Sequence, residues 1–164
     1  MPRIDVPEGN ADPEVRVWAL RPEMGMAAGA LSHAIYDQSI VPVRERELAR
    51  IRIAQINQCA ICLTWRKTEG ASEAMSEADY AHVKDWATHP DYTERERLAI
   101  EYAETFALAH DRLDDEFYAR LRAGYTDPEV LDLTVCIGGW LALGRALHVL
   151  GIDDSCRIPE HIAR

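Results

Sequence analysis

The chain has 164 residues, with 18 lysines and arginines, 28 aspartates and glutamates, and 48% apolar residues. This size and composition suit one globular domain with its own core, and a formal net charge of −10 offers no basic surface to nucleic acid. The N-terminus lacks the apolar run of a secretory signal, and the most apolar stretch, residues 133–144, is shorter than the about 20 residues that a membrane-spanning helix needs. We therefore expect a cytoplasmic protein with no nucleic-acid or membrane partner.

Apolar residues recur at spacings of three and four along most of the chain, which predicts an all-α protein of about six to seven helices. The helical domain is predicted over residues 22–151. Residues 1–21 are expected to form an N-terminal extension, and residues 152–164 a C-terminal tail.

The first predicted helix covers residues 22–37 and should direct Met26, Leu31 and Ile35 toward the core. The second covers residues 42–57. Its apolar residues form one stripe, so its arginines are expected on the opposite, solvated side.

Three later helices begin with a capping box, in which a Ser or Thr precedes an acidic residue by three positions. The pairs are Ser76 with Asp79, Thr93 with Glu96, and Thr126 with Glu129. A further short helix is predicted over residues 113–124. The last helix runs to about Gly151 and is apolar nearly all round, so other helices or another subunit must cover it. The pair Gly138-Gly139 would allow a close backbone approach there.

Cys59 and Cys62 are the only two cysteines at close spacing. Positions three apart on a helix share a face, so their sulfurs can form a disulfide with small adjustment. If the chain breaks at Asn57-Gln58, the pair lies in the first turn of a new helix, where free N–H groups stabilise a thiolate. Such a pair can also bind zinc or be two small buried apolar residues. Zinc would need two more ligands, and no second CxxC supplies them, so redox chemistry is favoured.

The segment RERELARIRIAQINQCAICLTWR resembles the carboxymuconolactone decarboxylase and alkylhydroperoxidase-D-like superfamily. Its members are all-helical oligomers with a Glu twelve residues before the first Cys of a CxxC, and the matching positions here are Glu47, Cys59 and Cys62. The likeness continues through YTERERLAIEYAETFAL and LDDEFYARLRAGYTDPEVLDLT, over roughly residues 25–150.

The resemblance implies that Cys62 attacks a hydroperoxide and that Cys59 then closes a disulfide, which an external dithiol reductant must reduce again. It further implies a homo-oligomer, a trimer or hexamer, that needs no cofactor and no metal.

One position departs from the family pattern, which has a His four residues after the second Cys, linked to the Glu in a proton relay. Arg66 stands there, and Arg cannot act as a base. As a cation one helical turn from Cys62, it is expected to favour the thiolate. A fold-back of the chain near Asn57 would bring Glu47 level with Arg66, so we expect an ion pair between them beside Cys62. The alternative is that both are solvated surface charges.

The sequence thus predicts a thiol-dependent hydroperoxide reductase or disulfide oxidoreductase. The site residues would be Cys62, Cys59, Glu47 and Arg66. Two alternatives stay open. One is a lyase of the lactone decarboxylase type, which works without a CxxC, and the other is a non-enzymatic redox-sensing helical oligomer. The six histidines are scattered singly, and His148 has the strongest claim to replace the missing base. Trp65 and Trp140 are either core residues or walls of a pocket around the thiols.

Overall fold

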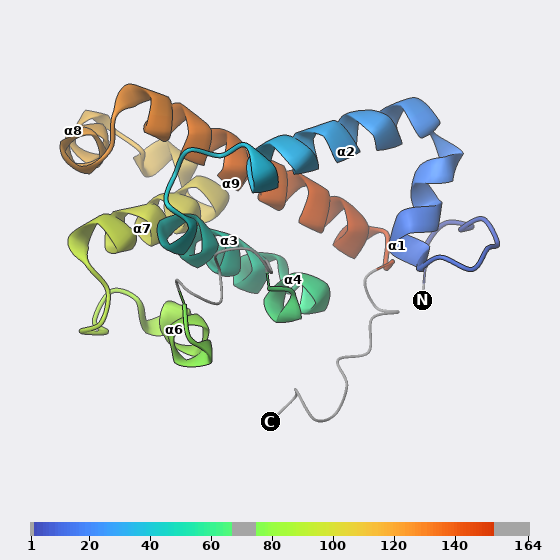
Figure 1. Ribbon diagram of the computed structural model, residues 1–164, viewed down its shortest axis with the longest axis horizontal. Coiled ribbons are helices and arrows are strands. Elements are labelled where there is room, and N and C mark those ends of the chain that lie inside the picture. Colours follow the sequence, from blue (N-terminus) through green and yellow to red (C-terminus); the bar gives the residue numbers. More distant parts are fainter. Residues whose placement is uncertain (1, 67–74, 153–164) are drawn as a thin grey trace.

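A computed structural model describes residues 2–66 and 75–152. Within these ranges the chain forms eight α-helices and three short 3-10 helices and contains no strand, which confirms the all-α prediction (Figure 1). The elements, in chain order, are α1 (Pro13–Arg16), η1 (Val17–Leu20), α2 (Pro22–Asp37), α3 (Val43–Asn57), α4 (Ala60–Thr64), α6 (Glu77–His82), η2 (Val83–Asp85), α7 (Glu94–Leu108), η3 (His110–Arg112), α8 (Asp115–Gly124) and α9 (Asp127–Val149).

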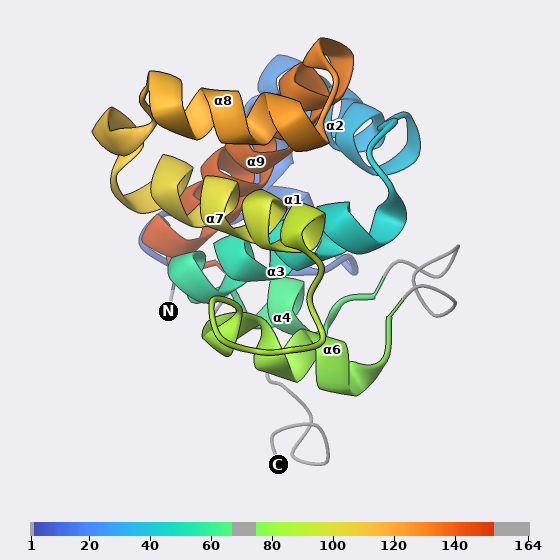
Figure 2. The same ribbon diagram turned by 90° about the vertical axis from the view of Figure 1, so that its left-hand side faces the viewer.

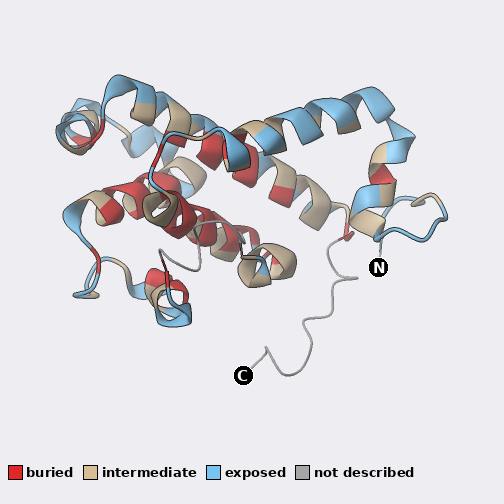
Figure 3. Cartoon of the chain, in the orientation of Figure 1, coloured by how far each residue is buried: buried red, intermediate tan, exposed pale blue. Residues whose placement is uncertain are grey.

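Helix α3 lies at the centre of the molecule and packs against α7 and α9. Figure 2 shows α8 above this group and α4 with α6 below it, and α2 packs against α9. Buried residues concentrate on α3, α7 and the middle of α9 (Figure 3). The main core therefore sits where these three helices meet, and α3 is enclosed on all sides.

Helix α2 has the predicted bounds, but only one of its faces is covered. Ile35 is 2% exposed and Leu31 packs against the core, as predicted, whereas Met26 is 69% exposed and its predicted core position is wrong. The α2 helix contacts α9 mainly through the face that carries Ile35, and Met26 lies off that face. A Cβ atom at Gly139 would be 3.0 Å from Ile35 Cδ1, so side chains of α2, and not its backbone as predicted, pack closely on Gly139.

The three predicted capping boxes are all present, each with its side-chain and backbone hydrogen bonds, at the starts of α6, α7 and α9. Helix α8 begins two residues later than predicted, because the Asp114 carboxylate accepts a hydrogen bond from the Phe117 N–H (2.9 Å) and caps it. Helices α1 and η1 were not predicted. This N-terminal segment is tied to the end of α9, where the Arg3 N–H donates to Leu150 O (2.8 Å).

Helix α9 is long and apolar enough to cross a membrane by length and composition alone, since its apolar part extends beyond residues 133–144. A core helix of a globular fold has the same composition, and Leu133, Ile137 and Trp140 are buried against neighbouring helices. Leu131 and Val135 on its other side are exposed. The neighbouring helices thus provide only part of the cover that its apolar surface needs.

Candidate functional site

The turn between α3 and α4 positions the two cysteines. Gln58 has a φ of 54°, in the left-handed region. Its N–H donates to Gln55 O (3.2 Å), and the Cys59 N–H donates to Ala54 O (3.0 Å). These bonds form a Schellman motif, in which the left-handed position is usually glycine. The chain therefore breaks where the sequence predicted, with Cys59 as the N-cap of α4 and Cys62 in its first turn.

Asn57 holds this turn against α9. Its Nδ2 donates to the carbonyl oxygens of Trp140 and Leu141, each at 3.3 Å, and its Oδ1 accepts from Arg145 Nε at 3.2 Å. A Cβ atom at position 144 would be 2.9 Å from Asn57 Nδ2, so Gly144 provides the space for the amide. The position of the dithiol is therefore fixed relative to the longest core helix.

Cys59 and Cys62 are joined in a disulfide with their Cα atoms 5.3 Å apart. Cys59 is 4% exposed, whereas Cys62 is half-buried and lines a cavity of about 330 Å³ between α2, α3 and α9. Only the Cys62 side of the pair faces this cavity. The remaining described cysteine, Cys136, is buried and unpaired, and burial raises the pKa of its thiol to about 12, as suits a packing residue. Cys156 lies outside the described residues.

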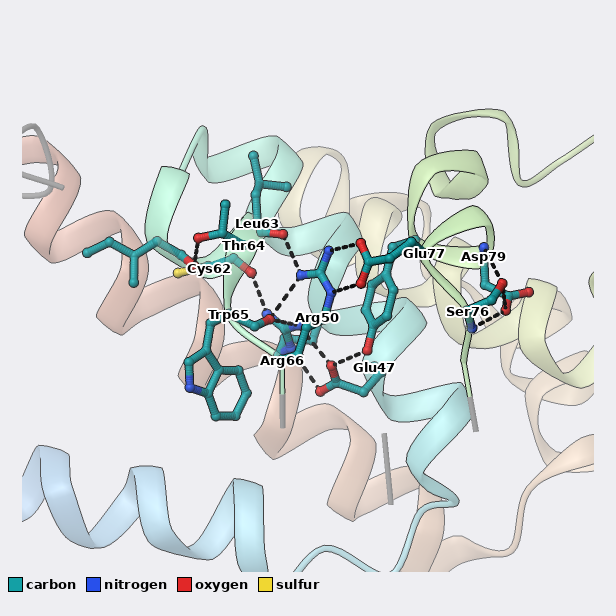
Figure 4. Close-up of polar contacts among 12 residues, drawn as sticks. Glu47, Arg50, Cys62, Leu63, Thr64, Trp65, Arg66, Ser76, Glu77 and Asp79 are labelled. Carbon is teal, nitrogen blue, oxygen red and sulfur yellow. Dashed lines mark hydrogen bonds and ion pairs between the residues drawn. The ribbon is translucent and has the colours of Figure 1, made fainter. Parts of the chain in front are cut away.

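A fully buried ion pair lies beside the dithiol (Figure 4). Arg50 Nε and Nη2 donate to the two Glu47 carboxylate oxygens at 2.9 and 2.8 Å, and both side chains are at most 1% exposed. The same guanidinium donates to Cys62 O (2.6 Å) and Trp65 O (3.1 Å). Arg50 therefore connects the buried carboxylate to the backbone of the cysteine segment and holds α4 against α3.

Tyr80 of α6 completes the surroundings of Glu47. Its hydroxyl donates to Glu47 Oε2 at 3.2 Å. Burial, together with the nearby carboxylate, raises the pKa of Tyr80 to about 12, so the hydroxyl keeps its proton at neutral pH and can donate. Glu47 thus receives hydrogen bonds from one cation and one neutral donor.

The predicted ion pair between Glu47 and Arg66 is wrong. Arg66 Nε and Nη2 donate to the exposed Glu77 carboxylate at 3.0 and 3.1 Å, and its guanidinium lies 3.8 Å above the Tyr80 ring (Figure 4). Arg50 takes the predicted place because it is on the same helix as Glu47, three residues away, and can bind both oxygens.

The predicted contact of Arg66 with Cys62 along one helical face is also wrong, because α4 ends at Thr64. Trp65 has extended backbone angles, and Arg66 follows it outside the helix. The chain does fold back along α3, as expected, but Arg66 then points toward α6.

Arg50 and Tyr80 are the site residues that the sequence reasoning missed. The expectation that the α3 arginines are solvated is wrong for Arg46 and Arg50, which are 3% and 1% exposed. A signal for this was present, since apolar residues surround Glu47 and Arg50 in the sequence ELARI, as they do in a helix enclosed on every side. Tyr80 is 33 residues from Glu47 and gave no local signal.

Aromatic rings form much of the cavity wall around Cys62. Tyr36, Trp18 and Trp140 line it, and burial raises the pKa of Tyr36. Trp65 is 41% exposed and packs edge-on against Tyr36, with ring centroids 4.9 Å apart. Trp140 is thus a core residue that also lines the cavity, so both interpretations apply to it, whereas Trp65 is not among the residues that line the cavity. Residues 2–66 and 75–152 contain no group of three or more His, Cys, Asp or Glu side chains placed to hold a metal ion.

An all-α fold with a dithiol beside a buried carboxylate agrees with the resemblance seen in the sequence. The sequence model of the carboxymuconolactone decarboxylase family matches residues 22–105. The chain belongs to this family.

Two known proteins illustrate what the chain is similar to. The uncharacterized protein YnjA of Escherichia coli (strain K12) is 32% identical over 117 residues, which are 70% of this chain and 64% of that protein, so the match covers less than two thirds of that relative. A structure of a protein of unknown function from Agrobacterium tumefaciens, for which an AhpD-type antioxidant defence role has been suggested, has a TM-score of 0.71 and 25% identity, over 87% of this chain and 94% of that one.

The debrominase Bmp8, solved in complex with 2,3,4-tribromopyrrole, has the same fold. Its TM-score is 0.70 at 17% identity, over 88% of this chain and 77% of that one. The fold thus occurs among proteins of different chemistry, and the activity of this chain must be argued from its own site.

Proposed function

We propose that the protein is a thiol-dependent hydroperoxide reductase or disulfide oxidoreductase that uses Cys62 and Cys59. The observation that carries this proposal is the unequal exposure of the two sulfur-bearing residues. Cys62 lines the cavity, whereas Cys59 is 4% exposed behind it. A substrate in the cavity can reach Cys62 first, which agrees with the roles that the family resemblance implies.

In the proposed reaction, the Cys62 thiolate attacks the terminal oxygen of a hydroperoxide and the O–O bond breaks. The alcohol leaves after taking a proton, and Cys62 becomes a sulfenic acid. The Cys59 thiolate then attacks the Cys62 sulfur and a disulfide forms. The sulfenic hydroxyl group leaves as hydroxide and takes up the proton that Cys59 released, which gives water. An external dithiol reduces this disulfide and is itself oxidised to a disulfide, which restores both thiols.

The chain's own residues prepare this step by position. Arg50 fixes the Cys62 carbonyl and lines the same cavity as Cys62. A cation at the edge of that cavity favours the thiolate form of a thiol that opens into it. Glu47 accepts two hydrogen bonds from Arg50 and so fixes it, and Tyr80 donates a hydrogen bond to Glu47. A protein that depends on an external dithiol suits the cytoplasm, where thiols are kept reduced.

The test is the consumption of hydroperoxide in the presence of a dithiol reductant. We expect Cys62→Ser to lower turnover by more than about 100-fold, as loss of a nucleophile does. Cys59→Ser should also lose turnover but should still form a sulfenic acid at Cys62, detectable by a sulfenic-acid probe and mass spectrometry. Cys136→Ala is the matched control, because this buried cysteine is outside the site, and it should keep turnover.

Each other outcome has a definite meaning. If the unsubstituted protein shows no peroxide-dependent turnover, the proposal that it is an enzyme fails. If the protein is instead oxidised once to the disulfide, with one peroxide consumed per chain, the redox-sensor alternative is favoured. Turnover that survives Cys62→Ser would reverse the roles of the two sulfurs.

A further inference from the structure

The cavity beside Cys62 has one wall that the family-matched region does not supply. That region begins at residue 22, yet Trp18 of η1 lines the cavity together with Gly25 and Gly29 of α2. Leu143 and Leu147 of α9 form the facing side. The N-terminal segment therefore helps to enclose the space into which a substrate of Cys62 would enter.

Trp18 is held firmly in this position. A Cβ atom at position 25 would be 2.9 Å from Trp18 Cβ, so α2 approaches Trp18 at a distance that only glycine allows. The Arg21 N–H donates to Trp18 O (3.1 Å), which closes the turn between η1 and α2. Further up the chain, the Arg3 side chain donates to Val149 O (2.9 Å) at the end of α9. The wall is thus a packed element rather than a loose tail.

The size and lining of the cavity define the ligand that it can hold. A closed cavity of about 150 Å³ accommodates benzene, so about 330 Å³ provides room for one ring or a branched alkyl group with its substituents. The walls are mostly apolar.

We propose that Trp18 determines substrate size and selects compact aromatic or branched organic hydroperoxides over hydrogen peroxide. The proposal rests on the proposed function, because it names the substrate class of the same site. The organic group fills the apolar cavity between Trp18 and α9, while its hydroperoxide group reaches Cys62. Hydrogen peroxide has no apolar part, so contact with this wall adds nothing to its binding free energy.

Steady-state kinetics with two oxidants test the proposal. Removing a large apolar contact from a pocket changes discrimination by about 10-fold or more. For Trp18→Ala, we therefore expect kcat/KM for cumene hydroperoxide to fall at least about 10-fold further than kcat/KM for hydrogen peroxide. Trp18→Phe should show a smaller change in the same direction. It keeps an aromatic ring at position 18 and so provides a second test if the alanine variant misfolds. Leu20→Ala is the matched control, since Leu20 belongs to the same 3-10 helix, is exposed and does not line the cavity.

A binding measurement separates this proposal from the proposed function. The alcohol 2-phenyl-2-propanol has the shape of the cumene hydroperoxide product but no reactive oxygen, and its binding can be followed by NMR titration. We expect binding to the unsubstituted protein and to Leu20→Ala, and at least about 10-fold weaker binding to Trp18→Ala.

Equal losses for both oxidants in Trp18→Ala, or unchanged binding of the alcohol, would overturn the role of Trp18. If the alcohol binds in a Trp18-dependent way but no hydroperoxide is consumed, the proposed function fails while the ligand class of the cavity stands.

Discussion

Arg50 is the residue on which the site geometry depends most. Its guanidinium makes two bonds to the Glu47 carboxylate and one each to the carbonyl oxygens of Cys62 and Trp65. Removing an ion pair from water is costly, and the cost is offset only when every donor is well placed. Here the donors are used to hold two helices and the cysteine segment together. Arg50 is therefore a positioning residue for the dithiol.

We expect Arg50→Met to lower the free energy of unfolding by about 3–5 kcal/mol, because it leaves the Glu47 carboxylate buried without its cation. The double variant Glu47→Leu with Arg50→Met removes both charges and should recover most of that loss, since apolar replacements of buried pairs are often neutral. Urea denaturation of both single variants and the double variant gives the coupling energy. Turnover should stay low in the double variant, because the cysteine segment has lost its anchor.

The exposed ion pair between Arg66 and Glu77 provides the control for this cycle. Glu77 is 78% exposed, so Glu77→Gln should change the free energy of unfolding by less than about 1 kcal/mol. If the double variant is as unstable as Arg50→Met, the unpaired Glu47 carboxylate is not the cause of the instability of Arg50→Met. If the double variant regains full turnover, Arg50 has no positioning role.

The difference between Arg50 and Arg66 shows how far residue pairing could be predicted. The sequence correctly indicated the break at Asn57 and the fold-back of the chain. It could not show which arginine would reach Glu47, because that depends on where α4 ends and on the burial of α3. The burial of α3 is set by packing against α7 and α9, which local spacing does not encode.

At the scale of the helices, local signals were more reliable. All three predicted capping boxes form, because a cap depends only on residues within one turn. The capping box of α6 does more than start a helix. Asp79 accepts hydrogen bonds from the Ser76 N–H (2.7 Å) and from Arg44 Nη2 (2.9 Å) of α3. This cap therefore also holds α6, and with it Tyr80, against the central helix.

The Asp79 carboxylate should make stability depend on pH. The Arg44 hydrogen bond and the cap lower the pKa of Asp79 to about 2. Because this value is below that of the unfolded chain, about 4, the carboxylate stabilises the fold above pH 4, and the contribution is lost as the pH falls toward 2. Asp79→Asn should therefore cost about 1–2 kcal/mol at pH 7 and progressively less below pH 4.

Urea denaturation at pH 7 and at pH 2.5 measures this difference directly. Asp127→Asn is the matched control, because Asp127 forms an ion pair with Arg122 in which both side chains are more than 60% exposed, and it should change stability little at either pH. A loss for Asp79→Asn that is equal at both pH values would exclude the titration of this carboxylate as the cause.

At the scale of the whole molecule, α9 still carries apolar surface that no helix covers. Leu131, Val135 and Val149 are 66%, 44% and 49% exposed. At 100° per residue, these positions fall within about 40° of one another around the helix, so they form one face. Leu131 and Val135 are one turn apart on this face, and neighbouring exposed apolar side chains of this kind are typical of an interaction surface. The sequence of α9 is apolar nearly all round, and packing within one chain covers only part of that apolar surface.

We expect this face of α9 to pack against another copy of the chain. Light scattering after gel filtration should give a mass of several chains for the unsubstituted protein, a trimer or hexamer by the family resemblance. Leu131→Asp with Val135→Asp places two charges on the face, and burying unpaired charges is costly, so this variant should dissociate to monomers. Val15→Asp, in the separate helix α1 and 60% exposed, should keep the assembled mass. A monomeric unsubstituted protein, or an unchanged mass in the double variant, would show that the α9 face is not the contact between subunits.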